Sequence, residues 1–298
     1  MCEKDGDKMM DCLDADGNLM QVPPETWRDE VLPELLESSW DDINLLYGVI
    51  TLAADNGFAK DVLDACGQAV KIDPYPERAA VTTAIIQLRA GDLESAENTL
   101  AKFEEEKGKT SLSRTYTSIL LGMQNKEDEM KAALFEALEI DPNNDLALEH
   151  WLDIHADEND LEKAIEALEE ISKLPNSWAS RLHLGFLAVA EQDKSKAVSL
   201  FTEAVEMAEG NTTSLTESGG ALMEAGFVVE MIDLLEPYYD PQKHGPVPGW
   251  ILIQGYLATG QKRKGIHNLN KVQDVAPQEM LGQLDELRIE LAKLPDEG

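Results

Sequence analysis

Cysteine is scarce in this chain, which has three cysteines, Cys2, Cys12 and Cys66, among its 298 residues. The three form neither a paired framework nor the close Cys spacing of a zinc site. We therefore expect free thiols and a reducing compartment, because disulfide scaffolds belong to oxidising ones.

Long apolar runs are also lacking. No stretch approaches the roughly 18 apolar residues of a membrane-spanning helix, and residues 1–20 contain no apolar signal-peptide core. We expect a cytoplasmic protein without membrane insertion, and a periplasmic location stays open if a signal was removed ahead of the numbered chain.

Positive charge is sparse, with 25 Lys and Arg against 58 Asp and Glu, which gives a net charge of −33. Such a surface repels nucleic-acid phosphates, so the composition predicts no nucleic-acid partner. A saline environment would also account for the acidity. Hydrophobic residues make up 43% of the chain, which is enough to build a core.

Signatures of catalysis are missing. The chain has no G-x-S-x-G motif, no phosphate-binding glycine loop and no zinc-type spacing among His150, His155, His183, His244 and His267. We therefore predict no catalytic residue, no metal, no cofactor and no enzymatic activity.

One acidic stretch resembles part of a calcium loop, since Asp14, Asp16 and Asn18 alternate and Glu25 stands at the twelfth place. Leu19 occupies the place that requires glycine, however, and two prolines follow where a helix should begin. We favour an ordinary turn or small hairpin around Asp16 over a calcium site.

A 34-residue period is present instead. Turn residues recur at Gly57, Gly91, Asn125, Asn159, Gln192, Gly226 and Gly260, separated by 34, 34, 34, 33, 34 and 34 residues. Pro74, Pro142 and Pro277 follow helix-like runs on the same lattice. Each unit therefore reads as a helix of about a dozen residues, a short turn and a second helix that ends in a proline or polar loop.

Small residues recur where the paired helices of a unit would cross. In the first helix they are Ala84, Ser118, Gly185 and Gly219, whereas Ile50, Leu152 and Ile253 depart from this pattern. The second helix carries Ala69, Ala96, Ala137, Ala164, Ala197, Ala204 and Gly265. Small side chains let two helices approach to the short end of the usual 8–10 Å spacing.

The period and these small residues resemble the tetratricopeptide repeat (TPR) family. The resemblance implies an all-α fold, a right-handed superhelical α-solenoid of about seven helix-turn-helix repeats with capping helices at both ends. The expected organisation is a tail or hairpin at 1–22, an N-terminal capping segment at 23–42, the array at 43–277 and a capping helix and tail at 278–298. Repeats start near Ile43, Glu77, Ser111, Asp145, Trp178, Thr212 and Pro246.

The same resemblance implies a partner-binding groove lined by the first helix of each repeat. Matching positions here are Tyr47, Thr51, Arg78, Val81, Ile85, Arg89, Leu112, Thr115, Ile119, Met123, Glu149, Asp153, Leu182, Phe186, Thr216, Met223, Trp250 and Gln254. Arg78 and Arg89 stand out as basic groups that could hold carboxylates or backbone carbonyls. Several of the apolar members could equally pack between repeats.

The predicted function is a non-catalytic scaffold whose groove holds a peptide or helix of another protein. The family subclass that grips a C-terminal aspartate uses asparagines which are replaced here by Thr51, Ile85 and Ile119, so chaperone C-termini are not the expected ligand. A self-assembling structural component and an acidic chaperone for an exported or apolar partner remain alternatives. His150 and His183 share the sixth place of adjacent repeats and are expected to be neighbours without a functional role.

Overall fold

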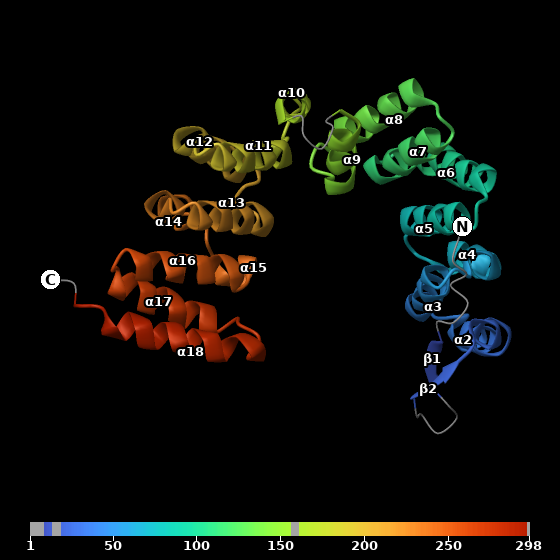
Figure 1. Cartoon of the computed structure of the whole chain (residues 1–298), viewed down its shortest axis with the longest axis horizontal. Helices are drawn as coiled ribbons and strands as arrows, with labels where there is room; N and C mark the ends of the chain where they lie inside the picture. Colours follow the sequence, from blue (N-terminus) through green and yellow to red (C-terminus); the bar gives the residue numbers. More distant parts are fainter. Residues whose placement is uncertain (1–8, 14–18, 156–160, 297–298) are drawn as a thin grey trace, which may run out of the picture. The chain divides into compact units, whose positions relative to one another are not determined.

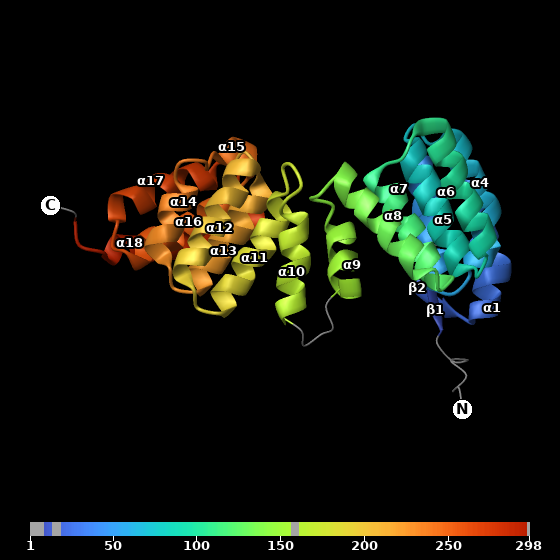
Figure 2. The same ribbon diagram turned by 90° about the horizontal axis from the view of Figure 1, so that it is seen from above.

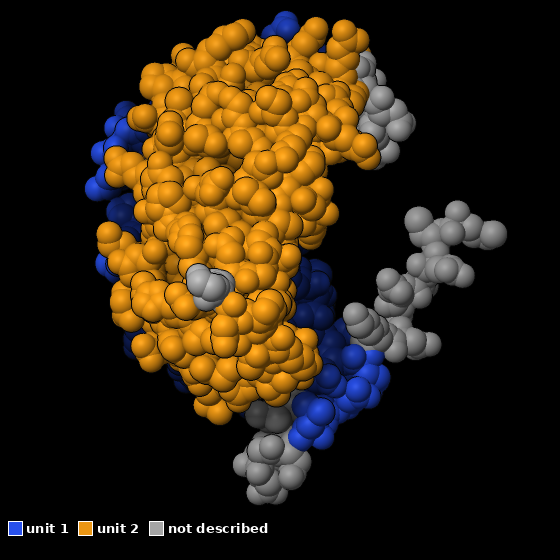
Figure 3. Space-filling view, turned by 90° about the vertical axis from the view of Figure 1, so that its left-hand side faces the viewer, with its two compact units in different colours: residues 1–137 blue, residues 138–298 orange. Residues whose placement is uncertain are grey.

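A computed structural model describes residues 9–13, 19–155 and 161–296. The described chain is almost entirely helical, and the expected all-α architecture is confirmed. The chain divides into two compact units, residues 1–137 and 138–298, which Figure 3 shows in separate colours. Each unit is a stack of antiparallel helix pairs, and we describe each by itself.

The first unit begins with a two-stranded hairpin and continues with stacked helices (Figure 1). Its elements are β1 (Met10–Leu13), β2 (Leu19–Val22), α1 (Pro24–Thr26), the π-helical turn η1 (Trp27–Val31), α2 (Leu32–Ser39), α3 (Ile43–Asp55), the 3₁₀ turn η2 (Ala59–Val62), α4 (Leu63–Ile72), α5 (Pro76–Arg89), α6 (Leu93–Lys107), α7 (Ser111–Met123) and α8 (Glu127–Ile140), whose last residues belong to the second unit.

The second unit continues the pattern of paired helices, which Figure 2 shows from above. Its elements are α9 (Asp145–His155), α10 (Leu161–Ile171), α11 (Trp178–Ala190), α12 (Lys194–Met207), α13 (Thr212–Glu224), α14 (Val228–Leu235), α15 (Pro241–His244), α16 (Val247–Ala258), α17 (Lys262–Gln273) and α18 (Gln278–Lys293).

The turn inside each repeat has one geometry. Gly57, Gly91, Asn125, Gln192, Gly226 and Gly260 all have positive φ, between 59° and 88°. At Gly91, its own N–H donates to the Leu88 carbonyl and the next N–H, of Asp92, donates to the Gln87 carbonyl. The same two hydrogen bonds recur at the other five turns named, so these six first helices end in Schellman motifs. The remaining turn residue, Asn159, lies outside the described residues.

In the second and fifth repeats the residue after the turn caps the second helix. The carboxylate of Asp92 accepts a hydrogen bond from the Ser95 N–H, and that of Asp193 accepts one from the Lys196 N–H. Reversal of the chain therefore needs only one left-handed residue and one N-cap, which explains why the two helices of a repeat lie close together.

Two helix crossings require glycine, because a Cβ atom there would collide with a side chain of the partner helix. A Cβ atom on Gly185 of α11 would lie 2.7 Å from Cδ1 of Phe201 in α12, and one on Gly219 of α13 would lie 2.7 Å from a methyl group of Leu235 in α14. Real Cβ contacts are almost never that short. Ala84, Ala96, Ala197 and Ala204 are buried at equivalent crossings, whereas Ala164 is only half-buried.

The helix crossing of the first repeat lacks a small residue in its first helix. Ile50 occupies the small-residue place of α3 and is completely buried, and the second helix is interrupted by η2 before α4 begins. The sixth repeat also departs from the expected pair, because α14 spans eight residues and the short α15 follows it.

Both ends of the array are covered. β1 pairs antiparallel with β2, with Met10 opposite Val22, and Trp27 stacks on Phe58 at a ring-centroid distance of 5.5 Å in the same core. At the other end, Leu284 and Leu291 of α18 are buried against the last repeat. These segments close the terminal apolar faces that a repeat array otherwise exposes.

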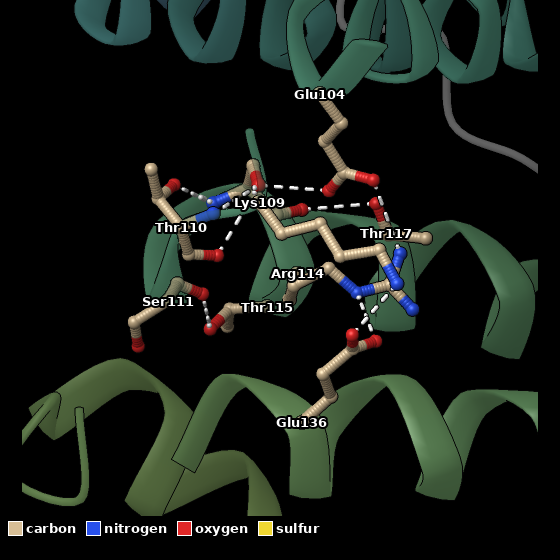
Figure 4. A network of polar contacts seen from close by, with 9 residues as sticks. Glu104, Lys109, Thr110, Ser111, Arg114, Thr115, Thr117 and Glu136 are labelled. Atoms are coloured by element: carbon tan, nitrogen blue, oxygen red, sulfur yellow. Dashed lines mark hydrogen bonds and ion pairs between the residues drawn. The ribbon is translucent and has the colours of Figure 1, made fainter. Parts of the chain in front are cut away.

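A polar joint connects the second and third repeats in the first unit (Figure 4). Arg114 of α7 lies between two carboxylates: Nη1 is 3.3 Å from Glu104 of α6, and Nε is 2.9 Å from Glu136 of α8. Lys109 also donates to Glu136, at 2.6 Å. In the second unit Arg181 of α11 forms the corresponding pair with Glu203 of α12, at 3.2 Å.

Two negative features concern the described residues only. None of their helices is long and apolar enough to cross a membrane, and none of their acidic, histidine or cysteine side chains form a group that could hold a metal ion. The stretch with Asp14, Asp16 and Asn18, weighed above as a calcium loop, lies outside the described residues.

The close crossing at Gly185 gives a first prediction. Gly185→Ala should destabilise the protein by about 1–3 kcal/mol, because the new methyl group overpacks against the Phe201 ring. Gly220→Ala is the matched control: its Cβ meets no atom within 4 Å, and alanine favours helix by up to about 1 kcal/mol. Urea unfolding followed by circular dichroism measures both, and equal midpoints for the two variants would contradict the close approach.

Candidate interaction surface on the first helices

The expected groove residues of the first unit lie on α3, α5 and α7 but differ in exposure. Val81 and Thr115 are buried, and the Thr115 hydroxyl donates to the Ser111 carbonyl inside α7. Tyr47, Arg78, Ile85, Leu112 and Ile119 are half-buried, while Thr51, Arg89 and Met123 are exposed. Ile85 and Leu112 also pack against the core that contains Val81. These two side chains therefore belong partly to the joint between repeats.

Arg78 is the centre of a compact polar cluster. Its Nε and Nη2 each donate to the Asp73 carboxylate at 2.8 Å, and its guanidinium lies 5.1 Å from the ring centroids of both Tyr47 and Tyr75. The Tyr47 hydroxyl donates to the same carboxylate at 2.6 Å. A bidentate, stacked arginine of this kind is held rigidly, and its charge is matched by the chain's own acid.

The Asp73 carboxylate is fully buried, and the hydrogen bond from Arg78 is the main reason that its pKa falls to about 2. The Tyr47 hydroxyl and the Tyr75 N–H act in the same direction. The other predicted basic residue, Arg89 of α5, forms an ion pair with Asp55 of α3, and both side chains are largely exposed. Both arginines of this face therefore already have carboxylate partners.

The expected groove residues of the second unit lie on α9, α11, α13 and α16. Leu182 is buried, Phe186, Thr216, Met223, Trp250 and Gln254 are half-buried, and Glu149 and Asp153 are exposed. The Phe186 ring contacts Phe201 at a centroid distance of 5.6 Å and His183 edge-on at 5.9 Å. Phe186 is thus anchored on one side by the core, and part of its ring faces solvent.

His183 lies within reach of acids on two neighbouring first helices. Burial lowers its pKa, while the charges of Asp145 and Glu149 on α9 and of Glu217 on α13 act in the opposite direction. Burial also lowers the pKa of His150, where Asp153 opposes the shift. The two histidines thus have different neighbours, and the described side chains near them make this face acidic and aromatic.

Sequence reasoning missed the partners that define these surfaces. Asp73 and Tyr75 stand in the loop before α5, and Asp55 is the last residue of α3. Asp73 could have been suspected, because it is followed by a proline and stands five residues before Arg78. Asp145 and Glu217 are two of many acids, and no spacing distinguishes them.

Helix pairs that repeat at a near-constant period, a left-handed residue in each of the described turns, and small residues at most crossings together decide the architecture. The chain has the tetratricopeptide repeat fold. Neither a family model nor a curated protein matches the sequence. Among solved structures, yeast Tom70 is similar at 14% identity with a TM-score of 0.47, over 88% of this chain and 58% of that one.

Two more TPR structures are similar at lower scores. A tetratricopeptide repeat protein from Parabacteroides merdae has 14% identity and a TM-score of 0.34, covering 88% of this chain and 99% of the other. The TPR2AB domain of yeast Sti1, solved in complex with an HSP90 peptide, has 13% identity and a TM-score of 0.30, covering 88% and 100%. Because the chain spans just over half of Tom70 and all three scores are below 0.5, none of them assigns a ligand to this TPR chain.

The Asp73 cluster gives a pH prediction. The pKa of Asp73 is lower in the folded protein than its ordinary value of 3.8, so its contribution to stability is complete above about pH 4 and is lost as the pH falls towards 2. The shift corresponds to about 2 kcal/mol. Asp73→Asn should therefore lower the free energy of unfolding by about that amount at pH 7, and by much less near pH 2.5.

Urea titrations of both proteins at pH 7, 4 and 2.5 measure this difference. Asp55→Asn is the control, because exposed ion pairs contribute about 0–1 kcal/mol and its effect should be small at every pH. A deficit in Asp73→Asn that stays constant from pH 7 to 2.5 would show that the carboxylate's charge is not the source of the stability.

Proposed function

We propose that this TPR chain is a non-catalytic scaffold that binds another protein through the first-helix face of its second unit. The partner segment is basic and carries apolar side chains. The observation that carries this proposal is the row of partly exposed Phe186, Met223 and Trp250 on the successive first helices α11, α13 and α16. The carboxylates of Glu149 and Glu217 act on His183, whose ring contacts Phe186.

The apolar members of this row are suited to act as anchors. Each is half-buried, so its rotamer is restricted before a partner arrives, and binding loses little side-chain entropy. Hot spots of protein interfaces are enriched in such aromatic residues. Helices α11 and α13 are in contact, as are α13 and α16, so the three proposed anchors stand on adjacent helices of the unit.

Charge defines the kind of partner. Glu149, Asp153 and Glu217 lie on this face, and His183 among them has a lowered pKa, so it contributes little positive charge at neutral pH. The chain as a whole carries a net charge of −33. A segment with lysine or arginine between apolar residues is therefore attracted at long range and matched at contact.

An array of 15-residue peptides that vary independently in charge and apolar content tests this proposal. The wild-type protein should select basic peptides with apolar residues, and its affinity should fall with rising salt. Glu149→Lys combined with Glu217→Lys should weaken the selected peptides at least tenfold. Met223→Ala should weaken them by about 1–2 kcal/mol, as expected for an interface anchor.

Matched controls distinguish an effect of substitutions on this face from effects of overall charge or stability. Glu279→Lys combined with Glu286→Lys makes the same charge change at exposed positions of α18, and Val229→Ala removes an exposed apolar side chain of α14. Both controls should bind within twofold of the wild type. Selection of acidic peptides, or equal losses in test and control variants, would rule the proposal out.

A further inference from the structure

A cavity of about 360 Å³ opens in the first unit between α4, α5 and α6. It lies among second helices and the back of α5, whereas the proposed partner face belongs to the first helices of the other unit. Its volume is at the lower end of the range for small-molecule sites. Val70, Ala79, Ala80 and Phe103 supply an apolar lining.

A comparison with the next repeat explains why the cavity is present. Counted from the repeat starts, Ala80 occupies the place that Arg114 has in the next repeat, and Val70 occupies the place of Glu104. Lys102 likewise stands where the next repeat has Glu136. The joint that Arg114 bridges with two glutamates, shown in Figure 4, is thus replaced by two short apolar side chains and a lysine.

One polar group in this lining lacks a hydrogen-bond partner within the described structure. Thr83 is 7% exposed, and its hydroxyl oxygen is buried without a partner. Its counterpart in the next repeat, Thr117, donates to the Ser113 carbonyl at 2.9 Å. An unsatisfied buried hydroxyl is destabilising, and a bound hydrogen-bond acceptor can satisfy it.

The cavity is lined by two lysines and two acids, and one of the acids is already paired with an arginine outside the lining. Lys102 and Lys107 line it together with Glu106, which is 4.0 Å from Lys102. Asp73 lines it as well, but its carboxylate is neutralised by Arg78 and hydrogen-bonded to Tyr47. A small molecule with an apolar body and one negative group would match this lining.

We propose that this cavity binds a small amphipathic carboxylic acid. The apolar body lies against Val70, Ala80 and Phe103, the carboxylate pairs with Lys102 and Lys107, and the Thr83 hydroxyl donates to an oxygen of the ligand. The site does not depend on the proposed partner face, because no residue is shared between them.

Octanoate is the probe, and displacement of the fluorescent anion 1-anilinonaphthalene-8-sulfonate from the full chain measures its binding. Octanoate should displace the dye, whereas octanol and octylamine should bind at least tenfold more weakly. Lys102→Glu should weaken octanoate at least fivefold, and Thr83→Val should weaken it several-fold. Lys131→Glu, an exposed lysine of α8 away from the cavity, is the charge control and should bind like the wild type.

Rebuilding the neighbouring joint provides an independent test. Val70→Glu combined with Ala80→Arg and Lys102→Glu copies the third repeat's network, fills the cavity, and should abolish octanoate binding with an unchanged circular dichroism spectrum. If this variant does not fold, Lys102→Glu and Thr83→Val decide the question. Octanol binding as tightly as octanoate, or unchanged octanoate binding in both single variants, would overturn the assignment.

Discussion

One backbone constraint organises this molecule: a residue in the left-handed conformation after each first helix whose turn the structure describes. Such a residue satisfies the last carbonyls of the first helix through a Schellman motif and reverses the chain within about three residues. The second helix then packs directly on the first, which favours small side chains at the crossing, as at Gly185 against the Phe201 ring. The 34-residue period, the core and the exposed faces all follow from this reversal.

The sequence was most informative where the backbone itself imposes a residue type. Glycine and asparagine tolerate positive φ, so the turns could be located from their spacing, and Gln192 was found because it stands on the same lattice. Alanine and glycine at the crossings could be predicted for the same kind of reason. The all-α repeat fold could therefore be predicted mainly from residue types that the backbone geometry favours at fixed positions.

Surface chemistry was less predictable, because it depends on which charges meet. Arg78 and Arg89 read as free basic groups in the sequence, yet each is paired, with Asp73 and Asp55 respectively. Val81, Thr115 and Leu182 stand at positions of the first helix that could face a ligand, but their side chains are buried. Periodicity gives the place of a side chain along a helix, whereas a small rotation of that helix decides its exposure.

Because the repeats share one backbone arrangement, side chains at equivalent positions of different repeats can be compared directly. The fourth and twenty-sixth places of the third and fifth repeats hold Arg114 with Glu136 and Arg181 with Glu203, so the same two places form an ion pair in each unit. In the second repeat these places hold Ala80 and Lys102, where a cavity takes the place of the bridge. Because the helices around them are of the same kind, this difference is in side chains and not in fold. The absence of a structural ion pair within a repeat can thus leave space, and a lysine without an acidic counterpart at the fourth place, at a site that the repeat pattern alone would assign to packing.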